Sequence, residues 1–277
     1  MSAPIPSSEV YELFAIRYAT MRSRRRAENF FPADDHDGPM PMDYFVWLAR
    51  SPKRTVLIDT GFGLAMAKQR SREWLRCPIE TLAALDVDPA SIEDVVLTHL
   101  HYDHAGNLDR LPNARFHLQD REMQFATGRC MCEGVMRHAY SLEDVTRMLG
   151  LVYGERVSFH DGDARIAPNL DVLLIGGHTW GLQSVRVLTA RGWVVLASDA
   201  AHYYENFQRR RLFPIVRDVA AMLDGHRRLV DEADSIDHIV PGHDPLVMAR
   251  YPRIDGDAVG IVRLDRPPSA LPEGAPH

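Results

Sequence analysis

The chain has 277 residues, of which 45% are hydrophobic and 25% charged, and its net charge is −6. This is the composition of a globular protein, and the acidic excess gives no reason to expect nucleic acid or an anionic membrane as partner. No apolar run approaches the roughly 18–20 residues of a membrane span, and Met1–Pro6 lacks the pattern of a secretory signal. Three cysteines make no disulfide framework. We therefore expect a cytoplasmic protein with reduced thiols, and the composition is compatible with an oligomer.

The first part of the chain alternates between strand patterns and irregular segments. Apolar and β-branched residues predict strands over 10–20, 44–49 and 55–59. Residues 22–42 are predicted to form a long loop on the substrate side, in which the cluster Asp34–Asp37 fits a solvated turn better than a cation site. Asp59 ends the third strand beside a glycine. Its carboxylate could orient a ligand histidine or be an ordinary turn aspartate, and the sequence leaves both open.

Four potential metal ligands fall within six residues after a buried strand predicted at 94–98. His99 and His101 are two apart, so on an extended backbone their side chains project to the same side. If the chain then coils, Asp103 and His104 face a second point nearby. Imidazole and carboxylate ligands suit zinc, and also iron, manganese or cobalt. The spacing His-x-His-x-Asp-His therefore indicates two adjacent metals rather than a turn that happens to be rich in histidine.

Helical spacing replaces the strand pattern over residues 120–158, after a strand predicted at 115–118. Ser141-x-x-Asp144 fits a capping box at the start of one of these helices. The insertion is rich in methionine and aromatic residues, which are typical of a lid over an apolar ligand and also of core packing in a helical subdomain. We expect this insertion, including Met148, to build a substrate pocket together with Phe30 and Phe31 of the early loop.

In the last part of the chain, candidate functional residues again follow strands. Strand patterns are predicted over 164–167, 170–175, 183–189, 193–197 and 236–240. His178, Asp199 and His243 lie where three of these strands stop, and His202 and Tyr203 follow Asp199; such positions favour active sites because the sheet fixes them. An amphipathic helix is predicted from Pro214, and 258–277 is predicted as a strand and a frayed tail.

The order of these elements predicts one α/β domain over residues 1–277. Strands come in runs with helices between them, which favours two mixed sheets packed face to face with helices outside. We therefore expect a four-layer αββα sandwich with a helical insertion.

The ligand pattern resembles the metallo-β-lactamase superfamily, from Asp59-Thr60-Gly61 through His243. The resemblance implies a first metal on His99, His101 and His178, a second on Asp103, His104 and His243, and Asp199 bridging both. Two divalent cations at such a short separation need a shared anion to offset their repulsion, which agrees with this assignment. Zinc is the expected metal, with iron, manganese or cobalt as alternatives.

Within the superfamily, the motifs resemble those of the N-acyl homoserine lactonases. The matching segments are 98–107, 177–184 and Asp199-Ala200-Ala201 leading to Glu205-Asn206-Phe207. Two departures stand out: Trp180 and Leu182 alter the histidine loop, and His202 stands where the lactonases usually carry a tyrosine. The resemblance implies that His202, or the neighbouring Tyr203, contacts the substrate carbonyl or leaving group.

The resemblance implies a dinuclear metal hydrolase that opens a lactone or a related cyclic ester by attack of a metal-bound hydroxide. An N-acyl homoserine lactone, a small molecule with an apolar part, is the example, and its hydrolysis would make this a quorum-quenching enzyme. Asp103 would return a proton to the leaving alkoxide. A glyoxalase II-like thioesterase would share all seven ligands, but only 34 residues follow His243, too few for a helical glutathione-binding domain. Another hydrolase of the same fold and a non-haem iron oxidoreductase are the remaining alternatives. All seven ligands would also serve another hydrolase of this fold, and the identity of the bound metal would test the oxidoreductase.

Overall fold

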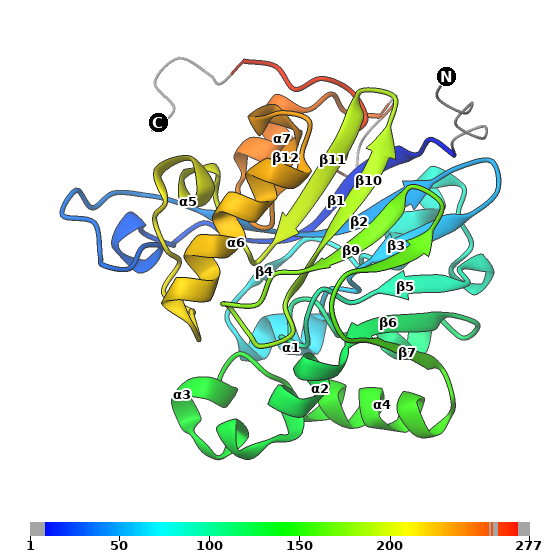
Figure 1. Ribbon diagram of the computed structural model, residues 1–277, viewed down its shortest axis with the longest axis horizontal. Helices are drawn as coiled ribbons and strands as arrows, with labels where there is room; N and C mark the ends of the chain where they lie inside the picture. The colour runs from blue at the N-terminus through cyan, green and yellow to red at the C-terminus, as the bar shows by residue number, and fades with distance from the viewer. Residues whose placement is uncertain (1–8, 255, 257–259, 271–277) are drawn as a thin grey trace, which may run out of the picture.

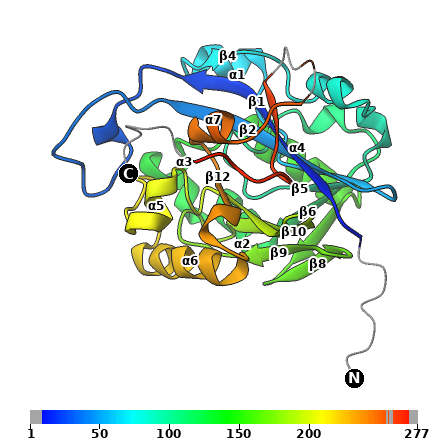
Figure 2. The same ribbon diagram turned by 90° about the horizontal axis from the view of Figure 1, so that it is seen from above.

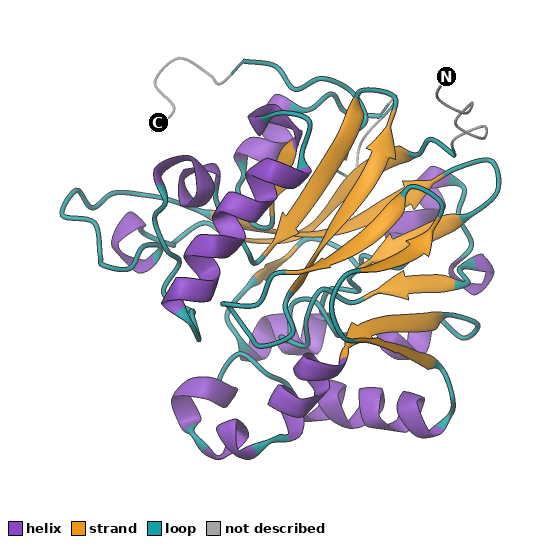
Figure 3. Cartoon of the chain, viewed as in Figure 1, coloured by secondary structure: helices purple, strands orange, loops and turns teal. Residues whose placement is uncertain are grey.

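The computed structural model describes residues 9–254, 256 and 260–270, and two β-sheets dominate it (Figures 1 and 3). The larger sheet has the order β13-β1-β2-β3-β5-β6-β7, and β4 pairs with β1 at one end. β3, β5, β6 and β7 run parallel to one another. The strands are β1 (Glu12–Met21), β2 (Met42–Arg50), β3 (Thr55–Ile58), β4 (Glu73–Trp74), β5 (Asp94–Val96), β6 (Arg115–Gln119), β7 (Val157–His160) and β13 (Ile261–Arg263).

The second sheet has five strands in the order β12-β11-β10-β9-β8. Its neighbours are antiparallel except β11 and β12, which are parallel and bring the ends of both strands to the same edge. The strands are β8 (Ala164–Ala167), β9 (Leu170–Leu174), β10 (Gln183–Thr189), β11 (Gly192–Ser198) and β12 (Ile239–Pro241).

The main hydrophobic core lies between the two sheets. Successive side chains of a strand point to opposite faces, so Leu13 and Ala15 of β1 pack towards β10 and β11, whereas Phe14 and Ile16 pack on the outer face of their own sheet. Both faces of the central strands are covered. This explains why β2 is an almost continuous apolar run instead of an alternating one.

Helices cover the two outer faces, which gives the predicted four-layer α/β arrangement (Figures 2 and 3). α5 (Tyr204–Arg209), α6 (Val219–Glu232) and α7 (Leu246–Arg250) contribute to the core of the five-stranded sheet. The outer face of the larger sheet packs against α1 (Leu64–Gln69), α2 (Asp120–Thr127) and α4 (Leu142–Tyr153); α3 (Gly134–Arg137) follows α2 along the chain. No helix in the described part of the chain is long and apolar enough to cross a membrane.

Several element boundaries differ from the sequence prediction. α6 begins at Val219, because the Asp218 side chain accepts the Ala221 N–H and caps the helix there; the residues after Pro214 form a loop. The predicted insertion 120–158 ends in strand β7 at the sheet edge, and 236–238 is a 3₁₀ turn before β12. Ser141 caps α4 as expected. The predicted tail begins at 258; β13 is its strand, and 258–259 and 271–277 lie outside the described residues.

Candidate metal centre

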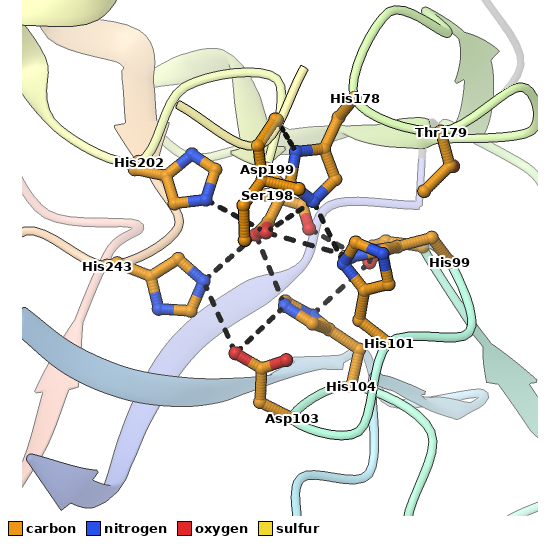
Figure 4. Close-up of polar contacts among 12 residues, drawn as sticks. His99, His101, Asp103, His104, His178, Thr179, Ser198, Asp199, His202 and His243 are labelled. Atoms are coloured by element: carbon orange, nitrogen blue, oxygen red, sulfur yellow. Dashed lines mark hydrogen bonds and ion pairs between the residues drawn. The ribbon is translucent and has the colours of Figure 1, made fainter. Parts of the chain in front are cut away.

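The seven predicted metal ligands converge at one end of the two sheets (Figure 4). Residues 99–104 follow β5 of the larger sheet, and the remaining three ligands follow β9, β11 and β12 of the smaller one. All seven side chains are almost completely buried. The sheets therefore bring together residues that are up to 144 positions apart, namely His99, His101, Asp103, His104, His178, Asp199 and His243.

A first group of side chains could hold one metal ion. His99, His101, His178 and Asp199 each offer a ligand atom, and these atoms all lie within 4.8 Å of one another. His178 Nε2 is 3.0 Å from a ring nitrogen of His101 and 3.1 Å from Asp199 Oδ2. Several acceptors thus point at one small volume, as they do in metal sites with imidazole and carboxylate ligands.

A second group lies directly beside the first. Asp103, His104 and His243 also offer atoms within 4.8 Å of one another. Asp199 Oδ1 is 2.9 Å from His243 Nε2 and 3.2 Å from His104 Nε2, whereas Oδ2 of the same carboxylate faces His178 of the first group. Asp199 therefore lies between the two groups, with one oxygen directed at each.

Three ring orientations are fixed by partners on the far side of the imidazole. His104 Nδ1 lies 2.7 Å from Asp59 Oδ2, His178 Nδ1 2.6 Å from the Ile215 carbonyl, and His243 Nδ1 2.9 Å from the Asp43 carbonyl. When Nδ1 donates to these oxygens, Nε2 is left as the free acceptor that a metal requires. Asp59 also accepts bonds from Thr98, so of the two readings of this residue the orienting one agrees with the structure.

The donor set fits metal ions in a further respect. His99 Nε2 and His104 Nε2 are buried and have no hydrogen-bond partner, which is costly unless something else satisfies them. Burial, followed by the neighbouring histidines, holds the pKa of His99 well below its usual value, so this imidazole is in the neutral form that binds metal. Burial opposes ionisation of Asp199, but His202, His104 and His243 hold its pKa well below the usual range.

Glu122 connects the loops around the first group, although sequence reasoning did not single it out. Its fully buried carboxylate accepts from Leu100 N at 3.0 Å, Tyr140 Oη at 2.9 Å and Thr179 Oγ1 at 2.5 Å, and also from Gly181 N at 3.2 Å. Burial raises its pKa, and these hydrogen bonds oppose that shift. The one available signal was a glutamate at the start of a helix, which no motif connects to the histidines.

The two candidates next to Asp199 have different surroundings. His202 Nε2 lies 3.0 Å from Asp199 Oδ2, and its ring stacks on Phe213 with centroids 3.5 Å apart. Its Nδ1 is buried without a partner, and His202 lines the cavity beside the metal ligands. Tyr203 instead points away: its hydroxyl donates to the Pro41 carbonyl at 3.2 Å and its ring packs near Phe30.

A cavity opens over these groups, and its walls differ from the prediction. Phe31 is 51% exposed, Phe30 is buried beneath the loop, and Met148 is part of the core, so none of the three lines it. Of the insertion, His138 and Ala139 line this cavity. Met131 lines a second cavity, which shares His138 with the first. The other lining residues of the first cavity are Arg24, Met42, Tyr44, Arg70, Arg72, His101, Tyr102, Asp103, Asp199, His202, Phe213, Ile215 and His243.

The acidic cluster of the early loop is occupied by arginines. Asp37 pairs with Arg25 at 2.6 Å, and Asp34 pairs with Arg26 at 2.6 Å and also with Arg211. These ion pairs agree with the expected loop structure and leave the carboxylates engaged.

Comparisons with known proteins give a consistent result. The family model described as "Metallo-beta-lactamase superfamily" matches residues 40–243. An N-acyl homoserine lactonase AttM of Rhizobium johnstonii is 26% identical over 238 residues, covering 78% of this chain and 86% of the relative. The lactonase AiiB of Rhizobium rhizogenes is 32% identical over 132 residues, which is 46% of this chain and 47% of that protein.

Solved structures show the same fold. A quorum-quenching N-acyl homoserine lactone lactonase aligns with a TM-score of 0.70 at 23% identity, over 86% of this chain and 94% of that one. AidC, described as a dizinc quorum-quenching lactonase in complex with a product, aligns with a TM-score of 0.66 at 16% identity, over 96% and 97% of the two chains.

Proposed function

This chain belongs to the metallo-beta-lactamase superfamily, and on that basis we propose that it is a dinuclear metal-dependent hydrolase that opens lactones. The observation that carries the proposal is the carboxylate of Asp199, which directs one oxygen at each of two histidine groups. Relatives with this family's motifs are N-acyl homoserine lactonases, so small lactones are the proposed substrates.

The proposed ligands follow the two observed groups. His99, His101 and His178 would hold one ion, Asp103, His104 and His243 the other, and Asp199 would bridge them. Two bound divalent cations would supply an activated water and polarise the substrate carbonyl at neutral pH. Zinc is the proposed metal, because a fold relative is a dizinc enzyme and because nitrogen and oxygen ligands suit it.

The chain's own groups would handle the substrate and its proton. Asp103 lines the cavity, and its Oδ2 lies 3.8 Å from His104 Nε2 and 3.9 Å from His243 Nε2. We place it where a carboxyl group can return a proton to the alkoxide that leaves when the lactone opens. His202, held against Phe213, would donate one N–H to the carbonyl or alkoxide oxygen.

Metal content and substrate preference test the main proposal. Protein purified without added salts is expected to contain two divalent ions per chain by elemental analysis and to release acid from lactones in a pH-drop assay. One ion or none in fully active protein would contradict the dinuclear site. Faster turnover of thioesters than of lactones would favour the glyoxalase II-like alternative, and bound iron with oxygen consumption would favour the oxidoreductase.

A pair of variants tests the assignment of His202. His202→Ala should lower kcat by on the order of 100-fold, the typical loss for one oxyanion donor, while metal content is unchanged. Tyr203→Phe is the matched control, since the Tyr203 hydroxyl contacts Pro41 away from the cavity. A decrease of less than about threefold for His202→Ala, far below the usual loss, would show that His202 only packs beside the ligands.

A cytoplasmic location remains a prediction from the sequence.

A further inference from the structure

Three arginines line the cavity above the metal ligands, and none of them is paired with a carboxylate. Arg24, Arg70 and Arg72 form no ion pair within 4.0 Å anywhere in the described part of the chain. The acidic side chains that share the cavity, Asp103 and Asp199, are instead in contact with histidines. Three guanidinium groups without an ion pair, in a protein whose net charge is −6, bring positive charge together at one place.

Neutral groups hold these arginines in position. Arg70 donates to the carbonyls of His138 and Tyr140, the latter at 3.2 Å, and its guanidinium lies 4.4 Å from the centroid of the Tyr102 ring. Arg72 Nε donates to the Tyr102 hydroxyl at 3.1 Å, and another of its nitrogens donates to the Arg70 carbonyl at 2.7 Å. The charges are therefore oriented without being neutralised.

Arg24 and Arg70 do not use all of their donors within the protein. Arg24 donates to the Asn29 side chain and to the Glu28 carbonyl, and it lies over the Phe213 ring that also stacks on His202. Arg70 Nε is buried and has no hydrogen-bond partner. A guanidinium presents five N–H donors in a planar fork that matches carboxylate and phosphate oxygens.

Neighbouring arginines show that the pairing pattern is selective. In the same loop as Arg24, Arg25 pairs with Asp37 and Arg26 forms a two-pronged contact with Glu205, at 2.7 and 2.6 Å. Arg22 pairs with Glu73. Carboxylates are therefore plentiful around this loop, and Arg24, the one arginine of residues 22–26 without a carboxylate partner, lines the cavity.

We propose that the substrate is a lactone that carries an anionic group, a carboxylate or a phosphate, recognised by Arg24, Arg70 and Arg72. The anion lies against the arginines while the lactone carbonyl faces Asp199 and His202 across the same cavity. This inference rests on the proposed lactonase function and narrows its substrate class. It also agrees with the absence of Phe30, Phe31 and Met148 from the walls of this cavity, because a long neutral acyl chain would require apolar contacts there.

Matched substrates test the inference with the metal-loaded enzyme. One pair is 5-oxotetrahydrofuran-2-carboxylate and its primary carboxamide, which differ in charge and hardly in shape. A second pair is 5-(hydroxymethyl)dihydrofuran-2-one and its phosphate monoester. We expect kcat/KM to be at least about 10-fold higher for the anionic member of one pair, as charged hydrogen bonds usually provide. The pair with the larger ratio identifies the anion as carboxylate or phosphate. Equal rates, or faster hydrolysis of both neutral members, would overturn the inference.

Arginine variants separate recognition from structural support. Arg70→Gln and Arg72→Gln should lower kcat/KM for the anionic member by roughly 10- to 100-fold and leave the neutral member within about twofold. Arg70→Lys, which keeps the charge but not the fork, should recover part of the loss. Arg25→Gln removes a surface ion pair with Asp37 and should change neither rate. Equal losses for both members would mean that the arginines only support the fold, and would overturn the inference.

A binding measurement keeps the two proposals distinguishable. If no lactone is hydrolysed at all, the proposed function is wrong, and the arginines are then tested by titrating inorganic phosphate into the purified protein by calorimetry. Phosphate affinity at least about 10-fold weaker in Arg70→Gln than in the wild type would support anion recognition on its own. Equal affinity in the two proteins would overturn it.

Discussion

Two histidine clusters of this protein contain the same residue types but differ in structure. At the metal centre, histidines from four loops converge on Asp199, and two ring nitrogens there have no hydrogen-bond partner. On β6 and β7, His117 and His160 stack with ring centroids 5.4 Å apart; His117 Nδ1 contacts His160 Nε2 at 3.1 Å, and its Nε2 contacts Asp94 at 2.9 Å.

The two clusters differ in how many of their ring nitrogens have a hydrogen-bond partner within the protein. Every ring nitrogen of His117 has a partner within the protein, and neither His117 nor His160 belongs to a group with metal-binding geometry in the described residues. In the metal centre, carboxylate and carbonyl partners occupy the outer nitrogens of His104 and His178, and two inner nitrogens, His99 Nε2 and His104 Nε2, have no hydrogen-bond partner. A histidine cluster thus indicates a metal site when its nitrogens converge without pairing.

The largest expected effect breaks the metal centre at its shared ligand. Asp199→Ala leaves two cations without their common carboxylate, so both metal content and lactone turnover should fall by more than the 10- to 100-fold typical of losing an outer-shell partner. Elemental analysis of the purified variant and the pH-drop assay measure both. Retention of two ions with near wild-type turnover would contradict the bridging role.

A smaller effect is expected from the carboxylate that orients a ligand. Asp59→Asn removes the charged acceptor at 2.7 Å from His104 Nδ1, and metal affinity or activity should fall by roughly 10- to 100-fold. Asp94→Asn makes the same change beside His117 and should leave metal binding unaltered. Chelator competition on both variants measures the contrast; equal responses would remove the distinction between the clusters.

A third kind of histidine, buried and outside both clusters, makes the stability of the protein depend on pH. His226 on α6 is buried, and burial lowers its pKa to about 4. The imidazole binds a proton near pH 6.5 in the unfolded chain but only near pH 4 in the folded protein. The contribution of His226 to the free energy of unfolding is therefore fully present above pH 6.5 and is lost as the pH falls towards 4. Between pH 7.5 and 5, the loss attributable to His226 should be about 2 kcal/mol.

Denaturant unfolding of the wild type and His226→Gln at both pH values isolates that contribution from other titrating groups. The variant should lose less stability on acidification than the wild type, since glutamine takes up no proton. Parallel pH profiles for the two proteins would show that His226 is charged or hydrated in the folded state.

The smallest effect is expected at the paired cluster. His117→Gln removes partly buried contacts to Asp94 and His160, so the free energy of unfolding should fall by only about 0.5–1.5 kcal/mol. Metal content and turnover should not change. A loss of metal in this variant would contradict the separation of the two clusters.

Local patterns explain which parts of the site could be predicted from sequence. The four ligands of residues 99–104 are encoded by spacing alone, and the later ligands each follow a strand that ends in a turn. Glu122 was not predictable in the same way, since its partners lie as far away as Gly181 and no motif marks the pairing. The unpaired arginines were equally hidden, because composition gives the number of charges but not which of them meet.

The same limit applies to the fold. The layered α/β arrangement followed from the order of strong strand patterns, and α4 began at its predicted cap, Ser141. The start of α6 was wrong because two signals competed: Pro214 fits a first helical turn, but the Asp218 side chain provides the cap that the helix uses. β7 was missed because an edge strand of four residues has too little alternation to stand out beside a helical segment.

The path of the chain also makes this protein divisible. β1 to β7 build one sheet and β8 to β12 the other, and the chain passes between them at the largely exposed turn 161–163 before β13 returns to the first sheet. A cut at Gly162 would leave residues 99–104 on one fragment and the remaining proposed ligands on the other. Because neither fragment would hold all the proposed ligands, we expect a divalent metal to favour their reassociation, which recovered hydrolysis would measure.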